Sequence, residues 1–192
     1  MSSGVSFDQL MQSLKKAAAA LREAEVEFML GGGLGSAARG GPESDHDVDL
    51  FLRQEDADRA LAVLEQAGFR PERPPEGWLY KAWDGDVFVD LIFSTAAGEI
   101  TDEHFERAEC FEVYAVPMLV QAPEDLLVMK LLALGETALD YKPCLEIARA
   151  LREQIDWEDV RGRTRESPYA KAFFTLVEEL GIVLAQEELA PR

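Results

Sequence analysis

The most constraining feature of the sequence is a glycine-rich turn followed by a short acidic strand. Residues 26–52 read VEFMLGGGLGSAARGGPESDHDVDLFL. The apolar run 26–30 predicts a strand that ends at the glycines. Residues 33–40 predict a short helix, because they are rich in good helix formers and end at a glycine. Residues 47–52 predict a second strand, so the segment runs strand, turn, helix, strand.

Three aspartates are predicted to gather on one face of a sheet. Side chains alternate between the two faces of a strand, so Asp47 and Asp49 point to the same side. Asp90 lies in another apolar strand, VFVDLIF, and joins them if the two strands are neighbours. Clustered carboxylates repel one another and need cations, and Mg²⁺ prefers oxygen ligands. The pattern predicts one or two Mg²⁺ ions held by Asp47 and Asp49, with Asp90 holding the catalytic ion and taking the nucleophile's proton.

The glycines of the turn are suited to bind phosphate. A strand-to-helix turn exposes backbone N–H groups, and the absence of side chains lets a phosphate approach them closely. Two pairs are suitably placed, Gly32 with Gly33, or Gly35 with Ser36 one helical turn later. Arg39 would add positive charge. The glycines therefore predict a site for the triphosphate of a nucleotide, beside the aspartates that bind its metal ions.

Among the remaining predicted elements, helices and strands are mixed before residue 120, and only helices follow it. The turn Asp84-Gly85-Asp86 between two apolar runs predicts a hairpin, and Pro117 marks an edge or a bend. The predicted helices share an amphipathic repeat, and the strands share apolar runs ended by turn residues. The helices cover 6–24, 55–69, 123–134, 144–155 and 167–184, and the strands cover 77–83, 87–93 and 111–120, the last as one strand or a pair.

Charge and cysteine content exclude several classes of protein. The net charge is −18, from 37 acidic and 19 basic residues. This balance disfavours an extended nucleic-acid partner, because such binding needs basic side chains to neutralise phosphates. Cys110 and Cys144 match no paired zinc spacing and no disulfide framework. No leader pattern and no apolar run near 20 residues is present, so we expect no membrane partner and a cytoplasmic location.

These residues carry a resemblance to a known family. GS, ten residues and then DVD resembles the signature of the polymerase-beta-like nucleotidyltransferase superfamily, and VDLIF is similar to the strand that bears its third carboxylate. Residues 28–52 also resemble the double-glycine version found in AbiEii-type toxins and in aminoglycoside and lincosamide nucleotidylyltransferases. In that alignment Gly32 and Gly33 take the phosphate turn. Lys130 is similarly placed to a helix lysine that serves nucleotide phosphates in the AbiEii-like families.

The resemblance implies an α/β nucleotidyltransferase fold, a short mixed sheet flanked by helices. Residues 1–120 would form the core, and residues 121–192 a helical region packed on it. The implied reaction is Mg²⁺-dependent transfer of a nucleoside monophosphate from an NTP to a small-molecule or protein acceptor, with release of pyrophosphate. The alternative is a catalytically inactive binding module or a toxin–antitoxin component. None of these functions implies a particular oligomeric state.

Several residues keep a second interpretation. Asp45 and Asp47 could be the paired acids, although the spacing from Ser36 would then shorten. For Lys130 the favoured interpretation is a lysine on an amphipathic helix that simply faces water. The segment GETALDYKP after it departs from the family pattern, where a more basic segment is usual, and this leaves Lys130 and Asp140 as weak candidates. The aromatic residues Trp78, Tyr80 and Trp83 could form a base-stacking platform, but packing against the sheet is favoured.

Overall fold

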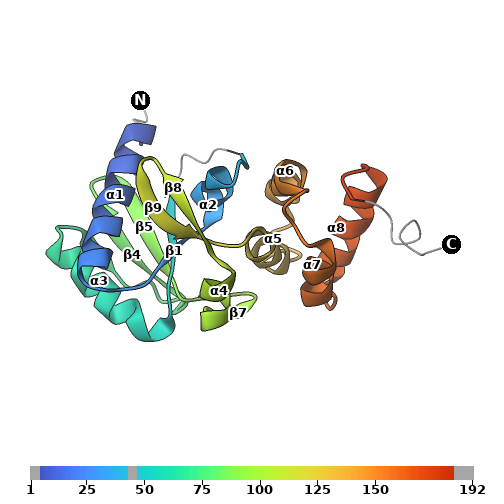
Figure 1. Ribbon diagram of the computed structural model, residues 1–192. Coiled ribbons are helices and arrows are strands. Elements are labelled where there is room, and N and C mark those ends of the chain that lie inside the picture. The colour runs from blue at the N-terminus through green and yellow to red at the C-terminus, as the bar shows by residue number, and fades with distance from the viewer. Residues whose placement is uncertain (1–4, 43–46, 184–192) are drawn as a thin grey trace, which may run out of the picture.

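A mixed sheet organises the N-terminal part of the chain, and helices flank it on both sides (Figure 1). The computed structural model describes residues 5–42 and 47–183. The sheet has seven strands in the order β3-β4-β5-β2-β1-β9-β8. Its strands are β1 Met29–Leu30, β2 Val48–Phe51, β3 Arg70–Glu72, β4 Leu79–Asp84, β5 Val87–Ile92, β8 Glu109–Val113 and β9 Val116–Val120.

The neighbouring pairs β2–β5 and β1–β9 are parallel, and the other pairs are antiparallel. A separate two-stranded sheet consists of β6 Ser94–Thr95 and β7 Gly98–Glu99. The helices are α1 Phe7–Glu23, α2 Gly32–Ala38, α3 Ala57–Gln66 after the 3₁₀ turn Gln54–Asp56, α4 Asp102–Arg107, α5 Pro123–Leu132, α6 Lys142–Leu151, α7 Trp157–Thr164 and α8 Pro168–Glu179.

One face of the sheet is closed by α1 and α3. The amphipathic α1 buries one stripe, which includes Leu10, Leu14 and Leu21, in the same apolar core as Val48 and Leu50 of β2. The side chains of that core are almost fully buried. This closed face therefore holds the sheet together.

The opposite face carries two adjacent rows of side chains. Strand register places Asp49, Asp90, Lys81 and Glu72 side by side across β2, β5, β4 and β3. Two residues further along the strands, an apolar row begins at Phe51 and continues through neighbouring strands. That row is Met29, Phe51, Ile92 and Leu79. The face is thus charged at one end of the strands and apolar at the other.

Figure 1 shows helices α5 to α8 beside the sheet, and these helices form a second apolar core. Asp125 of α5 is completely buried and accepts hydrogen bonds from Arg107 of α4 and Arg163 of α7, at 3.0 and 2.6 Å to its Oδ1. A buried carboxylate requires such partners. The three helices are therefore tied together by one carboxylate.

Capping residues and a tight turn define the ends of several elements. The hydroxyl of Ser6 accepts from the Gln9 N–H, and Ser6 N–H donates back to the Gln9 side chain, as a capping box requires. Ser167 caps α8, and β4 and β5 form the predicted hairpin with Gly85 at φ +65°. None of the helices within residues 5–42 and 47–183 is long and apolar enough to cross a membrane.

Some boundaries differ from the sequence prediction. The helix after the glycines begins at Gly32, because the carbonyl of Gly31 already accepts the first helical hydrogen bond, from the Gly35 N–H. Residues 111–120 form a strand pair, β8 and β9. Pro117 lies in β9, outside the two residues that pair with β1, so its missing N–H breaks no bond to that strand. Strand β3 and helices α4 and α7 were not predicted.

Candidate active site

The structure brings Asp49 and Asp90 together on the open face of the sheet. They are direct register partners on the parallel strands β2 and β5. Asp47 immediately precedes β2, and its negative charge raises the pKa of Asp49. The three predicted carboxylates therefore converge on one patch of the sheet. Their function as metal ligands and as the catalytic base stays a prediction.

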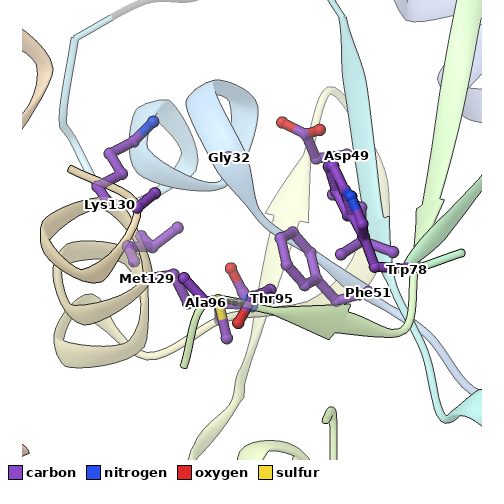
Figure 2. A pocket seen from close by; sticks show the side chains of 12 residues that line it. Gly32, Asp49, Phe51, Trp78, Thr95, Ala96, Met129 and Lys130 are labelled. Atoms are coloured by element: carbon purple, nitrogen blue, oxygen red, sulfur yellow. Dashed lines mark hydrogen bonds between the residues drawn. The ribbon is translucent and has the colours of Figure 1, made fainter. Parts of the chain in front are cut away.

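A cavity of about 650 Å³ opens beside Asp49. Figure 2 shows Asp49 and Lys130 on opposite sides of this pocket, with Gly32 of α2 between them and Phe51 and Trp78 lower on the wall. The lining is mostly apolar. It consists of Gly32, Asp49, Phe51, Trp78, Ile92, Thr95, Ala96, Gln121, Leu126, Met129, Lys130 and Ala133.

Burial makes the Asp49 carboxylate costly in its charged form. Desolvation, and then the negative charges of Asp47 and Asp90, raise the pKa of Asp49 from 3.8 to about 7, against the lowering effect of Lys130 and Lys81. The carboxyl group keeps some contact with the pocket, yet the surrounding atoms exclude most water. A site of this kind gains stability when a cation neutralises it.

Asp90 is buried and already has a cationic partner. Its Oδ1 accepts a hydrogen bond from Nζ of Lys81 at 2.7 Å. Burial raises the pKa of Asp90, and the bond to Lys81 opposes that rise. The carboxylate is thus held in place before any metal or substrate binds.

Gly32 lies in contact with Asp49, and its identity is a steric requirement. It has φ +55°, and a Cβ added there would lie 1.7 Å from Oδ2 of Asp49. By contrast, a Cβ on Gly35 would meet the carbonyl oxygen of Leu30 at 2.9 Å, inside the protein. Ser36 is buried and its hydroxyl has no partner within the described residues. Of the two alternative pairs, only Gly32 with Gly33 has a member on the pocket wall, and that member is Gly32.

Arg39 points away from the pocket. Its guanidinium is buried and donates to the carbonyl oxygen of Gln121 at 2.6 Å and to Oε1 of Glu109 at 3.0 Å. It also lies over the ring of Phe111, 4.8 Å from its centroid. These contacts join α2 to the β8–β9 hairpin. They argue against the predicted phosphate contact, and we do not assign Arg39 to the phosphate site.

Lys130 lies at the junction of two cavities. It lines the pocket beside Asp49 and also a second cavity of about 470 Å³, on the side of the α5–α6 connection. Asp140 lines only this second cavity. Lys130 therefore does not simply face water, because its charge is close enough to lower the pKa of Asp49. Asp140 stays a weak candidate.

The three aromatic residues do not form a base-stacking platform, which was the less favoured of their two interpretations. Tyr80 packs on Phe93, with ring centroids 5.1 Å apart, and belongs to the closed face. The indole of Trp83 donates to Glu72 at 2.7 Å. Trp78, at 42% exposure, is the member of the three that lines the pocket.

The donor chemistry of the acidic patch fits a hard divalent cation. Within residues 5–42 and 47–183, no group of three or more His, Cys, Asp or Glu side chains is arranged to hold a metal ion as it stands. The oxygens of Asp47, Asp49 and Asp90 are nevertheless the ligand type that Mg²⁺ prefers, and their mutual repulsion leaves a negative charge to neutralise. Asp45, the alternative partner of Asp47, lies outside the described residues.

The residues missed from the sequence include Lys81, which is bonded to Asp90, and Gln121, which lines the pocket. Lys81 could have been found by counting back from the two-residue turn, which pairs Asp84 with Val87 and hence Lys81 with Asp90. Gln121 gave no such signal. It reaches the pocket because β9 crosses over to pair with β1, where the Gln121 N–H donates to the carbonyl of Leu30 at 3.0 Å.

The sheet order, the glycine turn and the neighbouring carboxylates define a nucleotidyltransferase fold. A family model described as "Uncharacterised nucleotidyltransferase" matches residues 7–180, and the chain belongs to that family. The resemblance to the nucleotidyltransferase superfamily and the predicted α/β fold class are thereby confirmed. No curated protein matches the chain significantly.

Solved structures of antibiotic nucleotidyltransferases share the fold. ANT(2")-Ia in complex with adenylyl-2"-tobramycin is 18% identical, with a TM-score of 0.61 over 84% of this chain and 97% of that one. A solution structure of ANT(2")-Ia, also 18% identical, has a TM-score of 0.63 over 92% and 98%. The lincosamide adenylyltransferase LnuA, lincomycin-bound, is 13% identical, with a TM-score of 0.54 over 75% and 97%.

Proposed function

We propose that this protein transfers a nucleoside monophosphate from an NTP to a small-molecule acceptor, with Mg²⁺ as cofactor, and releases pyrophosphate. The observation that carries the proposal is the position of Asp49. It is a partly buried carboxylate, it has a second carboxylate as its register partner, and it touches a glycine turn and faces a lysine across a cavity.

Each residue has a distinct role in this proposal. The backbone N–H groups of Gly32 and Gly33 and the ammonium of Lys130 bind the triphosphate. Asp47 and Asp49 hold Mg²⁺, and Asp90 shares it and accepts the proton of the attacking hydroxyl. When bound, Mg²⁺ would neutralise the charge that develops on the phosphates. Positioning and charge neutralisation supply most of the rate acceleration in phosphoryl transfer.

The pocket lining supports a small acceptor with an apolar part. Phe51, Trp78, Ile92 and Met129 surround the region below Asp49, and Thr95 and Gln121 supply polar groups. A cavity of about 650 Å³ is in the size range of small-molecule sites. The acceptors of the antibiotic-modifying structures, tobramycin and lincomycin, are small molecules. A protein acceptor would need only one side chain to enter, and the enclosed apolar wall favours the small molecule.

The test is a transfer assay with each of four α-³²P-labelled NTPs, Mg²⁺ and an acceptor panel that includes tobramycin and lincomycin. We expect label in an acceptor product, with pyrophosphate release, and loss of both in Asp47→Ala. A matched control is Asp84→Ala, because Asp84 pairs with Lys16 on the closed side of the sheet. Binding of NTP without any transfer, and equal to that of Asp47→Ala, would instead identify an inactive binding module.

The glycine register is tested separately by nucleotide binding. Gly32→Ala should weaken binding of a non-hydrolysable NTP, because the new methyl group must displace the Asp49 carboxylate. Gly35→Ala should mainly lower stability, since its methyl group meets buried backbone. A crystal soaked with the same NTP and Mg²⁺ would show the phosphates at Gly32 and Gly33, and phosphates at Gly35 and Ser36 would reject this register.

A further inference from the structure

Lys81 lies between two acids in the charged row of the sheet. On β4 it is the register partner of Asp90 of β5 on one side and of Glu72 of β3 on the other. Its ammonium is bonded to Asp90 at 2.7 Å. Register partners on adjacent strands are within side-chain reach, so Lys81 can reach either acid.

Neighbouring side chains hold Asp90 and Glu72 in positions where Lys81 could exchange one partner for the other. Glu72 accepts a hydrogen bond from the indole N–H of Trp83 at 2.7 Å, and its negative charge is close enough to raise the pKa of Asp90. The Lys81 ammonium also lies 4.4 Å from the centroid of the Phe88 ring. The lysine side chain is 24% exposed and that of Asp90 is 11% exposed, so the pair is screened little by solvent.

We propose that Lys81 is a positioning residue that neutralises Asp90 in the absence of a divalent cation and moves toward Glu72 when a cation binds. It acts through Asp90 and does not touch the reacting atoms. The lysine and the cation compete for the same carboxylate, so Lys81 sets how strongly the acidic patch binds metal. The inference rests on the proposed function only in taking Asp90 as a cation ligand.

A second lysine–aspartate pair supplies the matched control. Lys16 of α1 and Asp84 at the end of β4 are also 2.7 Å apart. There the hydroxyl of Ser13 donates a further hydrogen bond to Asp84, and the pKa of Asp84 is lowered. Asp90 lies beside Asp47 and Asp49, and its pKa is raised. Only the Lys81 pair stands in an acidic cluster that a cation could occupy.

The experiment is a titration of the full chain with Mn²⁺ alone, followed by the electron paramagnetic resonance signal of free Mn²⁺. We expect Lys81→Met to bind Mn²⁺ about fivefold more tightly than the wild type, as removal of a partly buried competing charge implies. Lys81→Arg, which keeps the charge, and Lys16→Met should match the wild type. Asp90→Asn should weaken binding and cancel the effect of Lys81→Met.

A double-mutant cycle tests the movement toward Glu72. Glu72→Gln alone should weaken Mn²⁺ binding about threefold, because Lys81 loses its alternative partner. In the Lys81→Met background, Glu72→Gln should change nothing. An equal effect in both backgrounds would mean that Glu72 acts on the cation by charge alone, which overturns the movement.

Separate measurements distinguish the role of Lys81 from misfolding and from a failure of the proposed function. Melting in EDTA reports whether each variant folds, and Lys81→Gln replaces Lys81→Met if the latter does not. Unchanged or weaker Mn²⁺ binding in a folded Lys81 variant overturns the proposal. If no NTP is ever turned over but the Mn²⁺ results hold, the proposed function fails and the role of Lys81 stands.

Discussion

On β2, Val48 and Leu50 point to one face of the sheet and Asp49 and Phe51 to the other, and the two faces differ in what they contain. The first face is covered by α1 and α3 and carries an apolar core, with the Lys16–Asp84 pair at the end of β4. The second combines a charged row, an apolar row and a cavity. Alternation along a single strand thus separates the residues that hold the fold from those that are available for chemistry.

The largest difference between the faces should appear in catalysis. We expect Asp49→Asn to lower the rate of nucleotide transfer about 10³-fold, because it removes a charge that binds the metal at the reacting phosphate. The measurement is single-turnover transfer with saturating Mg²⁺ and NTP. A loss smaller than tenfold would remove Asp49 from the centre of the site.

On the closed face, Leu50→Ala should lower stability rather than activity. Leu50 is fully buried between the sheet and the helices, so truncation leaves a cavity and costs about 3 kcal/mol of unfolding free energy. Urea denaturation measures the loss, and the folded fraction should keep its transfer rate. A well-folded but inactive Leu50→Ala would show that the two faces are coupled.

The pH dependence of stability should separate Asp49 from an ordinary surface acid. Its pKa is about 7 in the folded protein, above the usual 3.8, so the folded state holds its proton more tightly than the unfolded state. Protonation of Asp49 therefore contributes to the stability of the folded state below pH 4, and this contribution is lost as the pH rises toward 7. Asp49→Asn should therefore stabilise the metal-free protein at pH 8 by about 2 kcal/mol, after screening through the pocket, and hardly at pH 4. Melting curves at both pH values test this.

The smallest effect is expected for Lys130 of α5, which lies across the pocket from Asp49. Lys130→Met keeps the apolar stem of the side chain and removes the charge, so we expect NTP to bind about tenfold more weakly, as for one charged hydrogen-bond partner. Isothermal titration with a non-hydrolysable NTP gives the value. Lys142→Met, on the next helix, is the control, and an equal loss there would indicate a general effect of charge.

Local signals in the sequence predicted the elements that carry the open face. The glycines, the alternation around Asp49 and the Asp84-Gly85-Asp86 turn are short-range patterns, and they placed β2, α2 and the hairpin. The length of the turn also sets the register that pairs Lys81 with Asp90. These features depend on neighbours in the chain, which is why the sequence shows them.

Features that depend on distant contacts could not be read in the same way. Arg39 follows the glycine turn and looks like a phosphate ligand, but Glu109 and the carbonyl of Gln121 capture it from about 70 and 82 residues away. Gln121 enters the pocket only through the β1–β9 pairing. Helix α7 has few apolar residues, and its end is fixed by Asp125 across the helical region.

The carboxylate of Asp125 has a consequence for how far α4 and α5 can move relative to one another. Arg107 precedes the β8–β9 hairpin of the sheet, whereas Asp125 begins the helix that carries Lys130. Separating α4 from α5 would strip a partner from this buried carboxylate, at a cost of about 3–5 kcal/mol. We therefore expect α4 and α5 to keep their spacing when a ligand binds beside Lys130.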